Sequence, residues 1–253
     1  MKRLVKWPAG LIAFGFLLIV AGGFLGGFRA LSLWNLPFWG SSYQQMELEG
    51  NPSFSSIDVD IRAGDVSLSY GDSYSASMRW NNTQYALSAH VEDDTLMVRN
   101  PSVAPNLPNA SASVHITVPR DSVLKQVSVH TSMGDVSLSR VTVSGTLSVS
   151  TSMGAIASSG ITAQGGADFT SSMGDLTLHG DFPCDLNATA DMGDLELEMV
   201  QPQSIYTIKA STDMGELEID GEDVDSSTYQ NGSGASKLTA ASSMGDLSLS
   251  FEE

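Results

Sequence analysis

The stretch from Thr131 to Ser139, TSMGDVSLS, returns five more times along the chain with small changes. The copies are TSMGAIASS from Thr151, SSMGDLTLH from Ser171, ADMGDLELE from Ala190, TDMGELEID from Thr212 and SSMGDLSLS from Ser242. Their methionines, Met133, Met153, Met173, Met192, Met214 and Met244, are separated by 20, 20, 19, 22 and 30 residues. A repeat of this period is typical of a solenoid, in which each rung stacks on the next.

Apolar residues alternate with polar ones before each methionine, as in Val127 and Val129, which is typical of a half-buried strand. After Gly-Asp the apolar residues resume at Val136 and Leu138, so the parity slips by one position. The slip predicts that Met still faces the core and that Met-Gly-Asp is a corner between two strands. Glycine accepts the dihedral angles of a corner. The predicted corner glycines are Gly64, Gly134, Gly154, Gly174, Gly193, Gly215 and Gly245.

The N-terminal region has the pattern of a membrane anchor. Residues 7–28 carry no charge and are about 33 Å long as a helix, which is enough to cross a bilayer. Three basic residues precede this segment and one follows it, so the N-terminus is expected in the cytoplasm and the rest outside. A cleaved signal peptide is the alternative, but no small-x-small cleavage site stands before a polar start. The chain is therefore expected to be a single-pass protein of the bacterial plasma membrane with an extracytoplasmic C-terminal domain.

The expected fold is an all-β, parallel β-solenoid with rungs of about 20 residues, preceded by one N-terminal transmembrane helix. The expected segments are a cytoplasmic stub (1–6), the anchor (7–28), a juxtamembrane linker (29–52), a first rung with a capping hairpin (53–126) and the Met-Gly-Asp repeats (127–253). The first rung begins at Ile57 and has Ala63 in the methionine position, and the hairpin turns at Asp93 and Asp94. An insertion over residues 220–237 is expected to be a mobile loop.

Composition excludes several classes of function. The 29 acidic residues outnumber the 12 Lys and Arg, and the net charge of −17 disfavours nucleic acid as a partner. The single cysteine, Cys184, excludes an intramolecular disulfide and has no cationic neighbour in sequence to activate it. The four histidines stand alone, without the spacing of a metal site or a catalytic base. We therefore predict that the protein is not an enzyme.

The acidic residues suggest a cation site as one hypothesis. Stacked rungs bring equivalent residues about 4.8 Å apart, so the aspartates after Gly should form a ladder of carboxylates. If the Met192 and Met214 rungs are neighbours, four carboxylates lie together as a candidate Ca²⁺ site, because hard cations take carboxylate oxygens. These four are Asp191, Asp194, Asp213 and Glu216. The alternative is a solvated acidic face whose corner aspartates bond to backbone, and no other cofactor is predicted.

Three segments together resemble a known family. They are VDIRAGDVSLSYGD from Val59, DDTLMVRN from Asp93 and HITVPRDSVLKQVSVHTSMGDVSLS from His115, with the Gly-Asp rungs after them. They resemble the bacterial β-strand-repeat family called toastrack, whose domains often carry an adhesin label. The resemblance covers nearly everything from about Ser53 to Phe251 and implies a β-solenoid exposed at the cell envelope. Some members are tied to envelope-stress signalling, and the family brings no catalytic residues to transfer.

These observations predict a membrane-anchored, extracytoplasmic β-solenoid that acts as a non-catalytic binding, adhesion or envelope-sensing module. Its expected partners are the membrane, a cell-envelope polymer or another membrane protein. The alternative is a structural or Ca²⁺-responsive envelope scaffold. A carbohydrate-active β-helix enzyme is a third reading, against which the rungs contain few basic residues beyond Arg140, Lys209 and Lys237.

Overall fold

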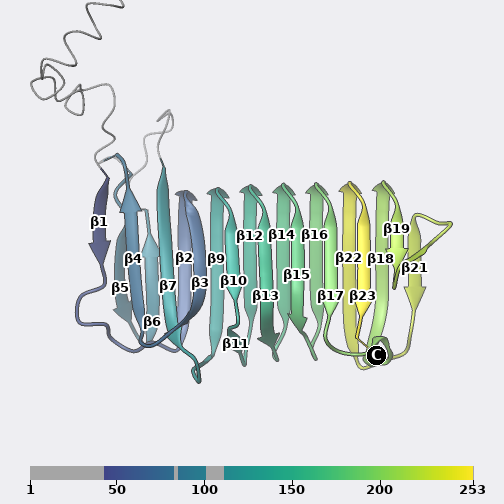
Figure 1. Ribbon diagram of the computed structural model, residues 1–253, viewed down its shortest axis with the longest axis horizontal. Coiled ribbons are helices and arrows are strands. Elements are labelled where there is room, and N and C mark those ends of the chain that lie inside the picture. Colours follow the sequence, from purple (N-terminus) through teal and green to yellow (C-terminus); the bar gives the residue numbers. More distant parts are fainter. Residues whose placement is uncertain (1–42, 83–84, 101–110, 253) are drawn as a thin grey trace, which may run out of the picture. The chain divides into compact units, whose positions relative to one another are not determined.

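The computed structural model describes residues 43–82, 85–100 and 111–252 (Figure 1). These residues form an all-β structure of mostly parallel strands with one short 3-10 helix, so the all-β and parallel-strand predictions are confirmed. The predicted anchor over residues 7–28 lies outside the described residues. Within the described ranges, none of the helices is long and apolar enough to span a membrane.

The described strands lie in two sheets, and one short 3-10 helix, η3 (Gln203–Ile205), is described over its full length. The strands are β1 (Gln44–Glu47), β2 (Ser56–Ala63), β3 (Asp65–Gly71), β4 (Ser75–Trp80), β5 (Ser88–Glu92), β6 (Thr95–Arg99), β7 (Ala112–Pro119), β8 (Val123–Leu124), β9 (Gln126–Met133), β10 (Val136–Ser139), β11 (Thr142–Val143), β12 (Leu147–Met153), β13 (Ile156–Ala163), β14 (Ala167–Met173), β15 (Leu176–Asp181), β16 (Leu186–Met192), β17 (Leu195–Met199), β18 (Tyr206–Met214), β19 (Leu217–Ile219), β20 (Glu222–Asp223), β21 (Thr228–Asn231), β22 (Ser236–Met244) and β23 (Leu247–Phe251).

Each rung contributes one strand to each sheet, and equivalent residues of successive rungs are paired in register. In the 13-stranded sheet the main order is β1-β4-β7-β3-β10-β13-β15-β17-β23-β19-β20, and in the 10-stranded sheet it is β21-β18-β22-β16-β14-β12-β9-β2-β6-β5. For example, Val127 of β9 pairs with Leu147 of β12, and Val136 of β10 pairs with Ile156 of β13. The repeats of the sequence are therefore stacked as parallel rungs (Figure 1).

The core lies between the two sheets and is built by the alternation seen in the sequence. Val127, Val129 and Thr131 of β9 are buried, and burial resumes at Val136 and Leu138 of β10. The interval of five residues between Thr131 and Val136 is the parity slip at the corner. Full burial of one such aliphatic side chain contributes about 1.5 to 3 kcal/mol, and every rung repeats several.

The N-terminal end of the array is covered by antiparallel strands. The rung made by β2 and β3 stacks on β9 and β10, with Ala63 beside Met133. Beyond it, β5 and β6 form a hairpin on the 10-stranded sheet, and its turn residues Asp93 and Asp94 have φ of 47° and 63°. On the other sheet, β7, β4 and β1 extend past β3. These strands cover the edge that the first rung would otherwise expose.

At the other end the spatial order of the rungs differs from their order in the sequence. The C-terminal strands β22 and β23 lie between the β16/β17 rung and the β18/β19 rung, as Figure 1 shows in yellow. The segment over residues 220–237, expected as a mobile loop, instead contains β20 and β21, which pair antiparallel with β19 and β18. The mobile-loop prediction is therefore wrong for those strands, because they cap the edge of the outermost rung.

Candidate functional site

The corner glycines bring neighbouring backbones closer than a side chain would permit. Six of the seven have φ between 141° and 154°, whereas Gly215 is not in this positive range. At Gly174 a Cβ atom would lie 2.2 Å from the carbonyl oxygen of Gly154 on the preceding rung. At Gly215 it would lie 2.1 Å from the carbonyl oxygen of Gly245. Glycine is therefore needed at these corners for close stacking, and at most of them also for its backbone angle.

The residue two positions before Met stabilises the corner by a buried hydroxyl group. Thr151 donates to the carbonyl oxygen of Gly134 at 3.2 Å, and Ser171 donates to that of Gly154 at 3.0 Å. Thr212 and Ser242 make the equivalent bonds in their rungs. These hydroxyls satisfy carbonyl groups that point along the stack, since a buried carbonyl without a partner costs about 1 to 3 kcal/mol.

The aspartate after Gly bonds to the backbone of the next rung. Asp175 Oδ1 accepts the backbone N–H of Asp194 at 3.0 Å, and Asp194 Oδ1 accepts that of Asp246 at 3.0 Å. Asp246 Oδ1 accepts the N–H of Glu216 at 2.8 Å. The backbone N–H of Ala155 donates to Asp135 Oδ1 at 2.9 Å, but Ala155 has no carboxylate to accept a bond from the next rung. The ladder of corner carboxylates thus has a structural role in joining rungs.

The four carboxylates of the calcium hypothesis belong to rungs that are not neighbours. The Met244 rung lies between the Met192 and Met214 rungs, so Asp194 and Glu216 are two strand spacings apart, roughly 9.6 Å. The expected adjacency is wrong because the C-terminal rung is inserted there. Among residues 43–82, 85–100 and 111–252, no three His, Cys, Asp or Glu side chains are grouped to hold a metal ion. Calcium binding by Asp191, Asp194, Asp213 and Glu216 stays a prediction, without the adjacency on which it was based.

The corner methionines face solvent, which contradicts the prediction that they face the core. Met133, Met153 and Met173 are 44%, 43% and 42% exposed, and Met214 at the outer rung is 63% exposed. The chain leaves the inward parity at Met rather than after Gly, because the corner begins there. The hydrogen bonds of the corner engage the backbone of Met and not its side chain.

The outer face of the 13-stranded sheet carries rows of short hydroxyl side chains. Ser67 of β3 pairs with Ser137 of β10, and Ser69 pairs with Ser139. On the other side of β3 the same rows continue with His115 and Thr117 of β7. Such rows offer hydrogen-bond donors and acceptors at the spacing of the strands, about 4.8 Å.

A groove of about 510 Å³ lies on this face where β4, β7, β3 and β10 run side by side. Its lining combines two valines with hydroxyl groups and charged side chains of both signs, and consists of Asp65, Val66, Ser67, Ser77, Arg79, Ser113, Val114, His115, Asp135 and Ser137. His115 Nδ1 is 2.5 Å from Ser67 Oγ. The Arg79 guanidinium lies 5.3 Å from the ring centre of Tyr43, which is half exposed. The groove thus combines a cation and an aromatic neighbour with hydroxyl and carboxylate groups.

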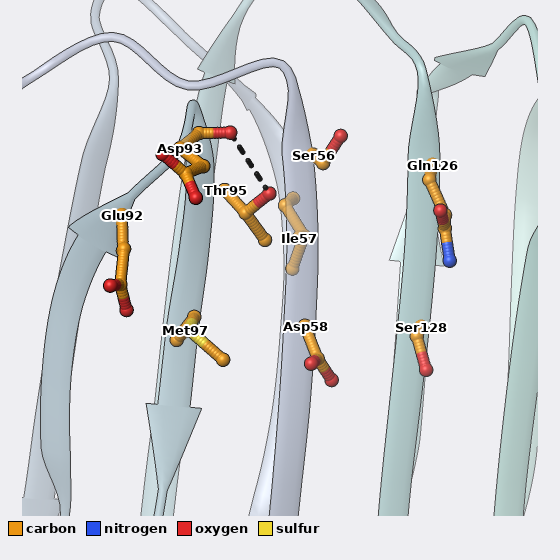
Figure 2. Close-up of a pocket in the computed structure, with 9 residues that line it drawn as sticks. All are labelled: Ser56, Ile57, Asp58, Glu92, Asp93, Thr95, Met97, Gln126 and Ser128. Atoms are coloured by element: carbon orange, nitrogen blue, oxygen red, sulfur yellow. Dashed lines mark hydrogen bonds between the residues drawn. The ribbon is translucent and has the colours of Figure 1, made fainter.

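A second groove, of about 570 Å³, lies on the 10-stranded sheet near the capping hairpin (Figure 2). It is lined by Ser56, Ile57, Asp58, Glu92, Asp93, Thr95, Met97, Gln126 and Ser128. Figure 2 shows Asp58 between Met97 and Ser128 on neighbouring strands, in agreement with their register. Arg99 pairs with the Asp58 carboxylate, and the Thr95 hydroxyl donates to the Asp93 carbonyl at 3.5 Å. This groove is more acidic than the first.

The cysteine thiol and two of the histidines take part in separate hydrogen bonds. The Cys184 thiol is buried, donates to the carbonyl oxygen of Ala163 at 3.1 Å, and has its pKa raised by burial, which disfavours the reactive thiolate. His115 and His130 lie on different sheets, and each is bonded to a serine hydroxyl. Neither histidine is bonded to the thiol.

Sequence reasoning missed both grooves. Their side chains come from strands that are far apart in the chain, such as Asp65 and Asp135, and the capping strands complete them. The available signal was the serine at outward positions in successive rungs, at Ser67 and Ser137. It predicts a polar face but not where the capping strands form a groove.

Comparisons with known proteins found one family match and solved structures of low sequence identity. The family described as Toastrack DUF4097 matches residues 51–250. A candidate cell adhesion protein from Clostridium sporogenes ATCC 15579 is 11% identical, with a TM-score of 0.54 over 83% of this chain and 100% of that chain. A candidate adhesin from Bacteroides fragilis NCTC 9343 is 14% identical, with a TM-score of 0.45 over 83% and 98%. No curated protein matches the chain. Likeness at these identities concerns the fold alone.

Proposed function

The chain belongs to the toastrack DUF4097 family, and from this fold we propose that it is a non-catalytic binding module of the cell envelope. In this proposal the outer face of the 13-stranded sheet holds an extended polar polymer of the envelope. The binding region is the groove across β4, β7, β3 and β10 together with the hydroxyl rows beside it. Carbohydrate-containing polymers fit, because their hydroxyl groups can pair with serine, aspartate and arginine side chains.

The observation that carries the proposal is the in-register pairing of Ser67 with Ser137 and of Ser69 with Ser139 beside the groove. A regular row of small polar side chains leaves the backbone surface open to an extended ligand. Both described grooves are open and carry hydroxyl and carboxylate groups, unlike the enclosed apolar pockets that hold small molecules. Arg79 and His115 add the hydrogen-bond donors that an acidic or sugar polymer would need.

The proposal includes a membrane anchor over residues 7–28. The uncharged segment and the basic residues before it support a single pass with the domain outside the plasma membrane. Protease added to intact protoplasts should then digest the domain. Protection of the domain from protease would contradict this orientation.

The binding proposal is tested by sedimentation of the full-length chain in detergent with purified peptidoglycan sacculi. The variant carries Ser67→Tyr and Ser137→Tyr, which fill the row without adding charge. The matched control carries Ser148→Tyr and Thr170→Tyr on the outer face of the other sheet, outside both grooves. We expect the first variant to lose binding at least tenfold and the control to retain it. Equal binding by both variants, or none by the unmodified chain, would contradict the proposal.

A structural scaffold is the second candidate function, and the corner hydrogen bonds favour it. Asp175, Asp194 and Asp246 each join one rung to the next without any ligand. A scaffold of this kind needs no binding face. Absence of sacculus binding, together with loss of envelope integrity in cells that lack the chain, would favour the scaffold over the binding module.

A further inference from the structure

Six methionines form one column along the edge where the rungs turn from the 10-stranded to the 13-stranded sheet. In spatial order they are Met133, Met153, Met173, Met192, Met244 and Met214. The carbonyl of each bonds to the glycine N–H of the preceding rung at 2.7 to 3.0 Å, which fixes the spacing along the column. Six of the eleven methionines of the chain therefore share one structural position.

The fold does not require methionine at this position. Ala63 occupies it in the first rung, where Gly64 has φ of 142° and donates to the Met133 carbonyl at 2.7 Å, as in the other corners. The Ser or Thr and the Asp of the motif form hydrogen bonds at the corner, and the Gly permits close stacking of the rungs. The side chain of Met is the one part of the motif that the corner itself leaves unused.

Burial does not account for the methionines either. Five of them are 42% to 44% exposed, and this near-constant value indicates one repeated environment rather than irregular packing. A contiguous row of exposed large apolar side chains commonly marks a binding surface. The methionine side chains are therefore exposed along the whole column.

The thioether group has a specific chemistry that other apolar side chains lack. Soft sulfur ligands such as methionine select Cu⁺ over harder cations. A metal–sulfur bond is about 2.3 Å long in zinc sites, so an ion in linear coordination with bonds of this length joins two sulfurs about 4.6 Å apart. The rungs are about 4.8 Å apart, and the three rotatable bonds of methionine allow small adjustments.

The charges beside the column favour a cation. Asp135, Asp175, Asp194 and Asp246 each follow a column methionine by two residues and are exposed, as is Glu216. The domain is strongly acidic as a whole, since the chain has a net charge of −17. Such a field raises the local concentration of cations and lowers that of anions.

We propose that the methionine column binds soft monovalent metal ions, Cu⁺ and Ag⁺, with each ion held between the thioether sulfurs of two neighbouring rungs. Six methionines in such pairs would accommodate up to three ions per chain. None of the column methionines lines the polymer-binding groove, so the two proposals can fail independently. Hard divalent cations such as Ca²⁺ are not expected to bind the sulfurs.

The test uses the full-length chain in detergent, with Ag⁺ as a probe in chloride-free buffer. A Cys184→Ala background removes the thiol, which would otherwise compete for the ion. Calorimetry gives stoichiometry and affinity, and spectra of methionine labelled at the ¹³C methyl group identify the sulfurs involved. We expect two to three Ag⁺ per chain, with shifts for the column methyl groups and none for the buried Met78 and Met199.

The column variant carries Leu at all six positions, a change that keeps volume and apolar character. Met46→Leu with Met97→Leu is the matched control, since both are methionines outside the column. We expect the column variant to bind Ag⁺ at least a hundredfold more weakly and the control to bind as before. Thermal melting establishes that both are folded. If the column variant does not fold, single Met153→Leu and Met173→Leu variants should each lose part of the stoichiometry. Unchanged binding in the column variants, or methyl shifts at Met78 and Met199 instead, would overturn the proposal.

Discussion

The structure of the corner at Gly174 predicts how much stability the fold should lose when a single methyl group is added there. In Gly174→Ala the new Cβ lies 2.2 Å from the carbonyl oxygen of Gly154, whereas ordinary contact begins at 3.4 Å. The two rungs must therefore separate by about 1.2 Å at that point. The alanine must also keep the φ of 142° that glycine has there, which strains an L-residue by about 1 to 3 kcal/mol.

The separation weakens three hydrogen bonds around the corner. They are the N–H of Gly154 to the carbonyl of Met173 at 2.8 Å, the N–H of Ile156 to the carbonyl of Asp175 at 2.9 Å, and the Ser171 hydroxyl to the carbonyl of Gly154 at 3.0 Å. Each contributes about 0.5 to 1.5 kcal/mol net. Together with the strain, Gly174→Ala should destabilise the array by about 3 to 7 kcal/mol.

Two other glycines allow the cost of backbone strain to be measured separately from the cost of close contact. At Gly166 φ is 126° but a Cβ meets nothing within 4 Å, so Gly166→Ala should cost only the strain of about 1 to 3 kcal/mol. At Gly215 φ lies outside the positive range but a Cβ lies 2.1 Å from a carbonyl oxygen, so Gly215→Ala should cost mainly the contact. Urea unfolding of the full-length variants, followed by circular dichroism, measures all three. The reasoning is refuted if Gly174→Ala costs no more than Gly166→Ala.

Three further variants test the remaining parts of the rung by thermal or urea unfolding. Thr151→Val removes a buried hydroxyl donor and should destabilise the fold by about 1 to 3 kcal/mol. Ala190 occupies the equivalent position in its rung, so Ala190→Ser should add a hydroxyl donor there and stabilise the fold by about 0.5 to 1.5 kcal/mol. A change in stability of the same sign in both variants would contradict this. Asp194→Ala should destabilise the fold by about 0.5 to 1.5 kcal/mol. Asp194→Asn should destabilise it less, because the amide keeps an acceptor oxygen for the next rung. An equal loss of stability in both variants would indicate that the charge of Asp194, and not its acceptor oxygen, stabilises the corner. Burial raises the pKa of Tyr206, whose hydroxyl donates to a carbonyl oxygen at 2.8 Å, so its stabilising contribution is present below the ordinary pKa of about 10 and is lost as pH rises further. Tyr206→Phe should therefore be less stable at neutral pH and less sensitive to alkali, and an unchanged alkaline transition would argue against this role.

Local patterns predicted the parts of the fold that depend on nearby residues. Alternation at Val127 and Val129 predicted a half-buried strand, and the slip before Val136 predicted a bend, because side-chain parity follows from backbone geometry. The hairpin turn at Asp93 and Asp94 was predicted in the same way, from turn residues between two apolar runs.

The rest depends on contacts that a local pattern does not contain. The orientation of Met133 was wrong because the bend begins one residue earlier than the apolar alternation suggests. The insertion of β22 and β23 was missed because the sequence gives the spacing of repeats and not their neighbours in space. Only the gap of 30 residues before Met244 indicated that this rung differs. The calcium hypothesis depended on the order of the rungs in space, and the position of the grooves depended on where the capping strands lie.

The rung order determines the methionine column and separates the calcium candidates, so its direct measurement is the most decisive one. Pairs of cysteines introduced at outward positions in a Cys184→Ala background can be tested for disulfide formation, which requires Cα atoms about 4.4 to 6.8 Å apart. Ser248 is the register partner of both Glu196 and Glu218. We predict that cysteines at 196 and 248 cross-link, that those at 218 and 248 do so too, and that those at 196 and 218 do not. Efficient cross-linking of 196 to 218, with none to 248, would contradict the account.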